Sequence, residues 1–266
     1  MNLQQTDIEL SIVMPCLNEA ETVGACIQKA QWFLKSQHIH GEIIVGDNGS
    51  VDGSVQIAES LGARVVSVPR RGYGTTCAGA SKASRGQYII LGDCDSSYDF
   101  SDLMPFLKKM RGGTDLVIGN RFQGGIESEA MPWKNRVIGN PFLTSMGRIL
   151  FSKQIGDYHC GLRGYTRAAF DRLNLKAAGM EFASEMIARA HLLGIKIDEV
   201  PTTLRRHGRS RDSHLRPWRD GCRHLRLMLA IKLTSLFQKF VRSFTPTLPA
   251  MIGNTNVESN TPRSSL

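Results

Sequence analysis

The chain has 266 residues, of which 41% are hydrophobic, 7% aromatic and 21% charged. This composition is ordinary for a globular protein and excludes collagen-like, mucin-like and disordered chains, and the length suits one large domain or two small ones. The six cysteines include no Cys-x-x-Cys pair, which argues against a zinc site and a disulfide framework. The first ten residues lack the pattern of a secretory signal, and no apolar run is long enough to predict a membrane span.

The formal net charge of +9 is concentrated near the C-terminus. Between Pro201 and Arg242, eleven lysines and arginines face two acidic residues, and the charges balance over the rest of the chain. This asymmetry indicates an anionic partner at the C-terminal segment: a membrane surface, a phosphorylated substrate or a nucleic acid.

Short apolar runs alternate with helical patterns through the N-terminal half. The predicted strands are Leu10–Met14, which Pro15 should close, then Glu42–Val45, Arg64–Val68, Tyr88–Leu91 and Asp115–Ile118. The predicted helices are one starting at about Glu21, one through Ala58 and Leu61, Gly74–Ser84, and Asp102–Met110 with Ser101 as its cap. The alternation predicts an α/β fold with a mostly parallel sheet flanked by helices.

The second half is less regular and predicts a helix over Glu181–Leu193, a strand over Ile195–Val200 and a long helix over Pro217–Phe244. The long helix has an apolar stripe interleaved with lysines and arginines, a pattern typical of helices at a membrane interface; packing on the main domain or on a partner subunit is the alternative. We therefore expect a main domain over residues 1–215, a basic amphipathic helical segment over 216–245, and a disordered tail over 246–266.

Polar side chains follow four of the predicted strands. These clusters are Asn18-Glu19, Asp47-Asn48, Asp93-Cys94-Asp95 and Gly119-Asn120-Arg121. Because ligands of parallel sheets bind outside the carboxyl ends of the strands, the clusters predict one binding site at that edge.

Asp93 and Asp95 are two residues apart on extended backbone, so their carboxylates point to the same side. Such a pair suits Mg²⁺ or Mn²⁺ with positions left for diphosphate oxygens, whereas turn capping is the simpler alternative. Asp47 would accept hydrogen bonds from a base edge or ribose hydroxyls, or else form an Asx-turn. The sequence has no P-loop and no dinucleotide-binding glycine fingerprint.

Several separate motifs, taken together, resemble the GT-A glycosyltransferases of family 2, and within them the dolichol-phosphate mannosyltransferase and polyprenyl-phosphate glycosyltransferase group. The motifs are Ser11–Glu19, Glu42–Gly53, Gly72-Tyr73-Gly74 with Ala78 and Gly79, Tyr88–Phe100, Asp115–Phe122, His159–Tyr165, Gly179–Met186 and Glu199–Arg211. The resemblance covers about residues 8–230 and implies a Rossmann-like GT-A catalytic domain.

The resemblance also implies roles for individual residues. The nucleotide-sugar would be bound by Pro15, Asn18, Glu19 and Asp47, with Arg205 and Arg211 on a loop that closes on the diphosphate. The metal ion would be held by Asp93, Asp95 and Ser97, and the acceptor phosphate by Arg121 and Arg136; a salt bridge is the alternative for Arg121. The sequence departs from the family where Arg211 replaces a more usual Lys and Ser96 a more usual acidic residue.

The implied activity is a metal-dependent inverting transfer of a sugar from a UDP- or GDP-sugar to polyprenyl or dolichyl phosphate. The protein would act in the cytoplasm, peripherally on the inner face of a membrane, with Mg²⁺ or Mn²⁺ as its cofactor. One alternative is a soluble family-2 enzyme that glycosylates a saccharide hydroxyl, which requires a general base. A nucleic-acid-binding protein is a remote alternative, because no helix-turn-helix, RRM, KH or zinc-finger signature is present.

Overall fold

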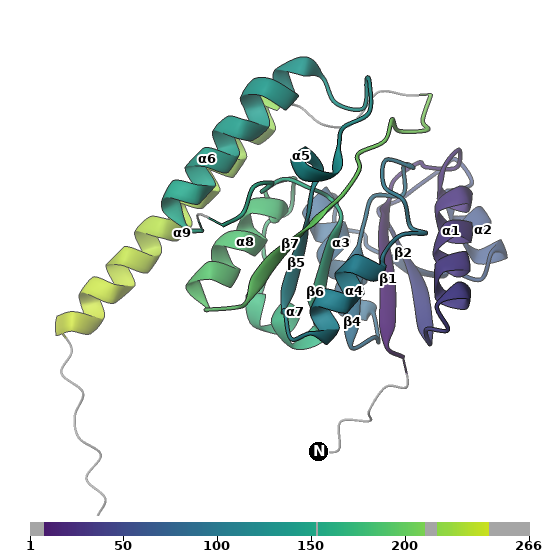
Figure 1. Ribbon diagram of the computed structural model, residues 1–266, viewed down its shortest axis with the longest axis horizontal. Coiled ribbons are helices and arrows are strands. Elements are labelled where there is room, and N and C mark those ends of the chain that lie inside the picture. Colours follow the sequence, from purple (N-terminus) through teal and green to yellow (C-terminus); the bar gives the residue numbers. More distant parts are fainter. Residues whose placement is uncertain (1–7, 153, 211–216, 245–266) are drawn as a thin grey trace, which may run out of the picture.

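The computed structural model describes residues 8–152, 154–210 and 217–244. Its centre is a seven-stranded sheet in the order β3-β2-β1-β4-β6-β5-β7 (Figure 1). The strands are β1 Leu10–Cys16, β2 Gly41–Asp47, β3 Arg64–Ser67, β4 Tyr88–Leu91, β5 Leu116–Asn120, β6 Arg163–Thr166 and β7 Ile197–Pro201. β6 is antiparallel to both of its neighbours and the other pairings are parallel, which confirms the predicted mostly parallel sheet.

Helices connect the strands and cover both faces of the sheet. They are α1 Val23–Ser36, α2 Ser54–Ser60, α3 Tyr73–Ala83, α4 Met104–Arg111, α5 Arg121–Gly124, the π-helical η1 Asn135–Gly139, α6 Asn140–Leu150, α7 Arg167–Leu173, α8 Phe182–Leu192 and α9 Pro217–Phe244. Two adjacent residues of β6 show the layering, because neighbouring strand residues point to opposite faces. Tyr165 bonds Ser81 of α3 through its hydroxyl at 2.6 Å, whereas a side chain at Gly164 would meet Met110 of α4.

The central strands form the core. Ile12, Val13, Ile90 and Val117 have no exposed surface, as expected for strands covered on both faces. Burial of each such side chain stabilises the folded state by roughly 1.5–3 kcal/mol. All six cysteines are free, in agreement with the sequence-based expectation.

Two local predictions are wrong, and one strand has no counterpart among the predicted elements. β1 continues through Pro15 to Cys16 and pairs with β2 over that whole length. Pro15 has no N–H to donate, but the pairing of β1 with β4 ends at Val13, so the sheet loses no hydrogen bond at Pro15. Ser101 does not cap α4, which begins at Met104; its backbone N–H and hydroxyl bond Asp99 instead. The long interval before the predicted Glu181–Leu193 helix contains β6, whose Arg-Gly-Tyr-Thr sequence carries no strand periodicity.

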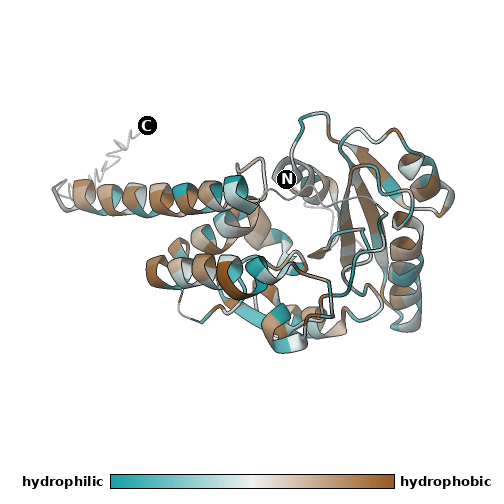
Figure 2. Ribbon diagram, turned by 90° about the horizontal axis from the view of Figure 1, so that it is seen from above, coloured by the Kyte–Doolittle hydropathy of each residue, from teal (hydrophilic) through white to brown (hydrophobic). Residues whose placement is uncertain are grey.

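α6 and α9 run side by side at one end of the sheet (Figure 1). Phe151, Ala188 of α8 and Met228 of α9 form a small buried cluster there, separate from the main core. The C-terminal part of α9 extends away from the sheet with hydrophobic residues along its length (Figure 2). Among the described helices, none is long and apolar enough to cross a membrane. The expected tail over 246–266 lies outside the described residues.

Candidate functional site

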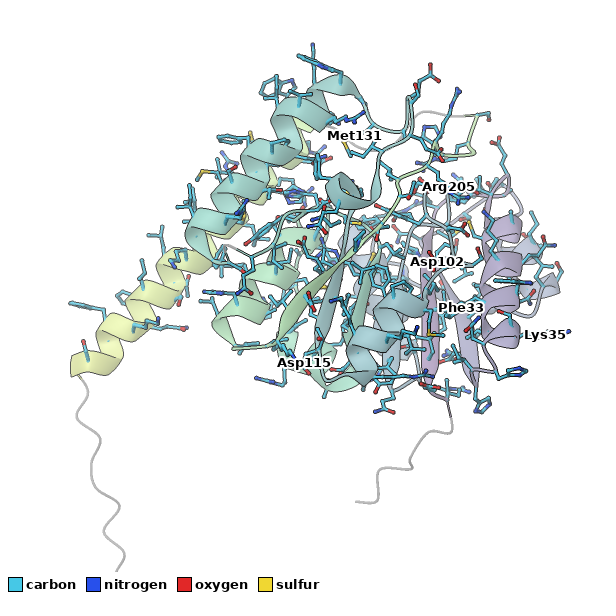
Figure 3. All side chains as sticks on the ribbon, viewed as in Figure 1. Phe33, Lys35, Asp102, Asp115, Met131 and Arg205 are labelled. Atoms are coloured by element: carbon cyan, nitrogen blue, oxygen red, sulfur yellow. The ribbon has the colours of Figure 1, made fainter. Side chains whose placement is uncertain are left out.

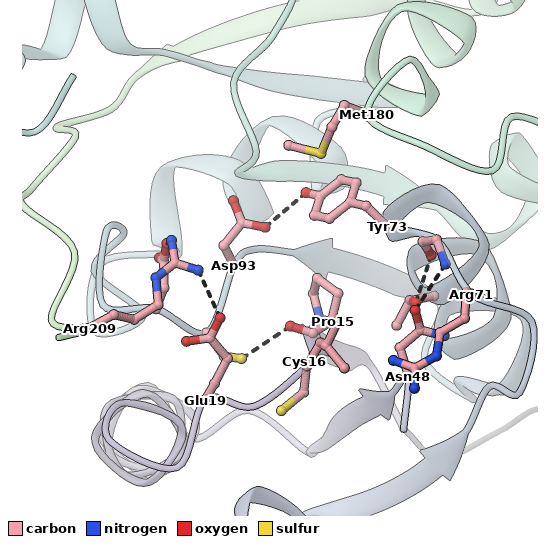
Figure 4. Close-up of a pocket in the computed structure, with 14 residues that line it drawn as sticks. Pro15, Cys16, Glu19, Asn48, Arg71, Tyr73, Asp93, Met180 and Arg209 are labelled. Atoms are coloured by element: carbon pink, nitrogen blue, oxygen red, sulfur yellow. Dashed lines mark hydrogen bonds and ion pairs between the residues drawn. The ribbon is translucent and has the colours of Figure 1, made fainter. Parts of the chain in front are cut away.

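A cavity of about 360 Å³ opens at the carboxyl ends of β1, β2 and β4 (Figure 4). The lining residues are Pro15, Cys16, Leu17, Glu19, Asn48, Arg71, Gly72, Tyr73, Thr76, Asp93, Cys94, Asp95, Met180 and Arg209. In Figure 3, Arg205 marks this edge of the sheet and Asp115, just before β5, marks the opposite edge. The cavity therefore forms where the sequence predicted a ligand site.

Asp93 lies on the wall of the cavity, one residue after Gly92, which follows β4. Its Oδ1 accepts a hydrogen bond from the hydroxyl of Tyr73 at 2.9 Å (Figure 4). Gly161 leaves room for the carboxylate, because a Cβ there would lie 2.4 Å from Asp93 Oδ2. Burial, and then the negative charge of Asp95, raise the pKa of Asp93 to about 7. A positive charge nearby would favour the ionised form.

Asp95 is held by the turn that follows it. Its Oδ1 accepts hydrogen bonds from the backbone N–H and the hydroxyl of Ser97. Ser96, between them, adopts a left-handed conformation with φ +68°, which is uncommon for a residue other than glycine and fixes the direction of the turn. The predicted role of Ser97 as a metal ligand stays a prediction; in the structure its hydroxyl orients Asp95.

Arg209 joins two of the predicted site residues. Its Nη1 donates to Glu19 Oε1 at 2.8 Å and its Nη2 to Asp95 Oδ2 at 2.7 Å. Arg209 belongs to the motif Glu199–Arg211, but no role was predicted for it. None was predicted for Tyr73 either, although the Gly72-Tyr73-Gly74 motif was the available signal.

The other predicted nucleotide-binding residues are distributed around this centre. Pro15 lines the cavity, and Asn18 lines a neighbouring hollow shared with Glu19 and Arg209. The Asp47 carboxylate accepts the backbone N–H groups of Gly49 and Ser50, which is the Asx-turn alternative, and Asp47 is not among the lining residues. Its contact with a nucleotide stays a prediction.

Asn48, next to Asp47, holds the segment that enters α3. Its side-chain amide donates to the carbonyls of Val68 and Arg70 and accepts the N–H of Gly72. Gly72 has φ +138° and a Cβ there would lie 2.2 Å from the carbonyl oxygen of Ala178, so only glycine fits. This packing fixes the start of α3, and with it Tyr73, beside Asp93.

Of the four arginines predicted to bind phosphate, the three that the structure describes do not line the cavity. Arg121 forms a buried ion pair with Asp157, the salt-bridge alternative considered for it. Burial by itself would lower the pKa of Arg121, but the negative charge of Asp157, its hydrogen bond and neighbouring groups together outweigh burial and raise that pKa above its usual value. Arg136 is exposed on η1, and Arg205 pairs with Asp99 at 2.9 Å. Arg211 lies outside the described residues. Roles for these four residues at phosphates stay predictions.

The residues present fit a divalent cation. Asp93 and Asp95 supply hard carboxylate oxygens on the wall of the cavity. The described residues contain no group of three or more His, Cys, Asp or Glu side chains suited to a metal. A cation held by two carboxylates would take its other ligands from water and phosphate, which is how Mg²⁺ usually binds.

Comparison with known proteins gives consistent matches. The sequence pattern of the family described as Glycosyl transferase family 2 matches residues 11–173. The low-salt glycan biosynthesis hexosyltransferase Agl6 of Haloferax volcanii is 38% identical over 221 residues, which are 83% of this chain and 53% of that protein. The chain thus spans about half the length of this relative. A dolichyl-phosphate hexose transferase of the same organism is 28% identical over 80% of this chain and 89% of its own.

The polyprenol monophosphomannose synthase of Mycolicibacterium smegmatis is 27% identical over 72% of this chain and 76% of its own. Among solved structures, glucosyl-3-phosphoglycerate synthase of Mycobacterium tuberculosis in complex with Mn²⁺, UDP and phosphoglyceric acid has a TM-score of 0.62 and 23% identity. The match covers 86% of this chain and 78% of that one. This likeness confirms the GT-A type of fold. With a family match over more than half of its length, the chain belongs to glycosyl transferase family 2.

Proposed function

We propose that the protein is a metal-dependent inverting glycosyltransferase that moves a hexose from a nucleotide-sugar to polyprenyl phosphate. The observation that carries the proposal is the pair of carboxylates, Asp93 and Asp95, on the wall of a cavity at the carboxyl ends of the parallel strands. The family membership and the names of the hexose-transferring relatives support the reaction class.

The donor would bind along β1, β2 and β4. Pro15, Glu19 and Asp47 lie on the side of the nucleotide, and Asp93 and Asp95 on the side of the diphosphate. When bound, Mg²⁺ or Mn²⁺ neutralises the charge that develops on the leaving nucleoside diphosphate. A related fold was solved with Mn²⁺ and UDP-glucose, which supports this donor chemistry.

The acceptor phosphate needs no general base. Its second pKa near 6 leaves it largely dianionic at neutral pH, so an oxygen can attack the anomeric carbon directly. The new carbon–oxygen bond forms as the bond to the diphosphate oxygen breaks, and the anomeric configuration inverts. Arg136, exposed on η1, would hold the phosphate, and Arg121 would offer Nη1, which the ion pair with Asp157 does not use.

The lipid part of the acceptor suits the exposed surface of η1, α6 and α9. Large apolar side chains with at least half of their surface exposed gather there and at Trp133, just before η1: Val137, Ile138, Phe142, Ile149, Leu233, Leu236, Phe237 and Phe240. Arg136, Arg148 and Lys239 add positive charge to the same helices. We propose that this surface, with the basic excess of α9, binds an anionic membrane peripherally.

The test is a transfer assay with the full chain, membrane lipid extract, Mg²⁺ or Mn²⁺, and labelled UDP-glucose, UDP-GlcNAc and GDP-mannose in parallel. The proposal is supported if label moves into the organic phase and if this transfer is lost both on addition of EDTA and in the Asp93→Asn variant. Asp171→Asn, an exposed residue of α7, is the matched control and should stay active. Label that moves only to a water-soluble saccharide would replace the lipid acceptor by a hydroxyl acceptor.

Unchanged metal-dependent transfer by Asp93→Asn would overturn the assignment of the site. Salt-sensitive binding to DNA without any binding of nucleotide-sugar would overturn the glycosyltransferase assignment altogether.

A further inference from the structure

Arg209 binds two carboxylates of the cavity at the same time. Its two terminal nitrogens contact Glu19 and Asp95 at 2.8 and 2.7 Å, and only 12% of its side chain is exposed. Hydrogen bonds between charged groups with little access to water are stronger than those at the surface. Arg209 is therefore a firmly held part of the cavity wall (Figure 4).

The backbone on both sides of Arg209 is anchored to the site. The N–H of Arg205 donates to the carbonyl of Ser97, and the N–H of Gly208 donates to the carbonyl of Asp95. On the other side, the N–H and the hydroxyl of Ser210 bond the carboxylate of Glu21. The segment 205–210 thus delivers the guanidinium to the two carboxylates.

This arrangement creates a competition at Asp95. The carboxylate proposed to hold the divalent cation already neutralises Arg209 through Oδ2, while its Oδ1 is engaged by Ser97. Two cations on one carboxylate repel each other, so a bare divalent ion must displace or share the contact with Arg209.

A diphosphate changes this balance, because it brings anionic oxygens for both cations. The Nε of Arg209 is buried and has no hydrogen-bond partner among the described residues, so the guanidinium has a donor available for such an oxygen. Arginine suits this exchange because its planar fork binds phosphate in two-point fashion and keeps its charge.

We propose that Arg209 is a positioning residue that makes cation binding depend on the nucleotide diphosphate. It weakens the binding of the bare cation by occupying Asp95, and it strengthens the complex with nucleotide by transferring its guanidinium to the diphosphate. This inference rests on the proposed function, since the diphosphate is that of the donor.

The experiment measures Mn²⁺ binding to the full chain by electron paramagnetic resonance, without and with UDP. Arg209→Gln should bind Mn²⁺ alone about tenfold more tightly than wild type. Addition of UDP should increase the Mn²⁺ affinity of this variant much less than that of wild type. Arg209→Lys, which keeps the charge without the fork, should bind Mn²⁺ alone as weakly as wild type and lose the gain from UDP.

Arg206→Gln is the matched control. Arg206 is a neighbour on the same segment, but it pairs with Glu129 at an exposed position and does not line the cavity. The substitution removes one positive charge, as Arg209→Gln does, but outside the cavity. We therefore expect the Mn²⁺ affinity to change less than about twofold.

Two outcomes distinguish this inference from the proposed function. If Arg209→Gln binds Mn²⁺ alone no more tightly than wild type, while Asp93→Asn abolishes binding, the role of Arg209 is wrong and the metal site stands. If wild type binds no Mn²⁺ with or without UDP, the metal-dependent function and this inference both fail. If thermal melting shows that Arg209→Gln does not fold, Arg209→Lys alone decides the test. An increase of its Mn²⁺ affinity by UDP as large as in wild type overturns the inference.

Discussion

Arg121 and Asp157 form a buried two-point ion pair, with Nε to Oδ2 at 2.6 Å and Nη2 to Oδ1 at 2.8 Å. Asp157 is fully buried, and its carboxylate also accepts the backbone N–H groups of Arg121 and His159. The pair thus ties the end of β5 to the loop that carries Gly161, which contacts Asp93. It links the acceptor side of the proposed site to the metal side.

Breaking this pair should destabilise the protein strongly. Asp157→Ala leaves a buried guanidinium without its partner, and we expect the free energy of unfolding to fall by about 3–5 kcal/mol in urea titrations. Arg121→Met combined with Asp157→Asn should recover part of the loss, because no charge is then buried and the amide oxygen can still accept one of the two backbone N–H groups. A loss below about 1 kcal/mol for Asp157→Ala would show that the pair is not structural.

Removing the hydroxyl of Tyr73 should weaken metal binding in a pH-dependent way. The hydroxyl lowers the pKa of Asp93, so Tyr73→Phe raises that pKa above about 7 and increases the protonated fraction at neutral pH. A proton then competes with the cation, and Mn²⁺ affinity should fall about threefold to tenfold at pH 7 and much less at pH 9. Tyr88→Phe is the control. An equal loss of Mn²⁺ affinity in Tyr73→Phe at both pH values would contradict this explanation.

Gly161→Ala should displace Asp93. The added Cβ would lie 2.4 Å from Oδ2 and 3.1 Å from a ring carbon of Tyr98, both closer than van der Waals contact. We expect Mn²⁺ affinity to fall about tenfold or more and stability to fall by about 1–3 kcal/mol. In Gly139→Ala the nearest atom is 3.7 Å from the new Cβ, so this variant should bind Mn²⁺ normally. Normal binding by Gly161→Ala would show that Asp93 tolerates displacement.

Stability should decrease as the pH falls from about 6.5 to 4. His224 bonds Ser184 through Nδ1 at 2.7 Å and packs edge-on against His159 at 4.6 Å between ring centroids. Burial lowers the pKa of His224 to about 4, and burial, followed by the proximity of His224, lowers the pKa of His159 well below its usual value. Both rings are neutral in the folded protein, whereas the unfolded chain takes up protons below about pH 6.5.

The unfolded state therefore binds more protons in this window, and the stability present above pH 6.5 is lost as the pH falls. For His224 the loss is on the order of 3 kcal/mol by pH 4. His224→Asn, which keeps an acceptor for Ser184, should flatten the dependence of unfolding free energy on pH. An unchanged slope would mean that other groups account for it.

Removing apolar side chains from the C-terminal half of α9 should weaken membrane binding without affecting the fold. Leu233 and Phe237 are 66% and 67% exposed, so replacing both by serine removes little buried surface. We expect binding to anionic phospholipid vesicles to fall about tenfold or more, with an unchanged melting temperature. Trp32→Ser, at a site on α1 that is 59% exposed, is the control. Undiminished vesicle binding by the double variant would exclude this surface as the docking site.

The sequence by itself determined the order of strands and helices in the N-terminal half and the position of the Asp93-Cys94-Asp95 motif after β4. These features follow from local chemistry, because apolar periodicity marks buried strands and polar residues mark the ends where the chain leaves the core. The predicted helix over Pro217–Phe244 and the structure agree on its bounds for the same reason.

Only the tertiary structure decided which side chains meet. β6 exists because β4 and β5 offer hydrogen bonds on either side of Arg163–Thr166, not because of its own composition. The ion pair of Arg121 with Asp157 and the bridge from Arg209 to Glu19 and Asp95 join residues 36, 190 and 114 positions apart. Contacts of this range depend on the packing of whole elements, and no local pattern in the sequence encodes them.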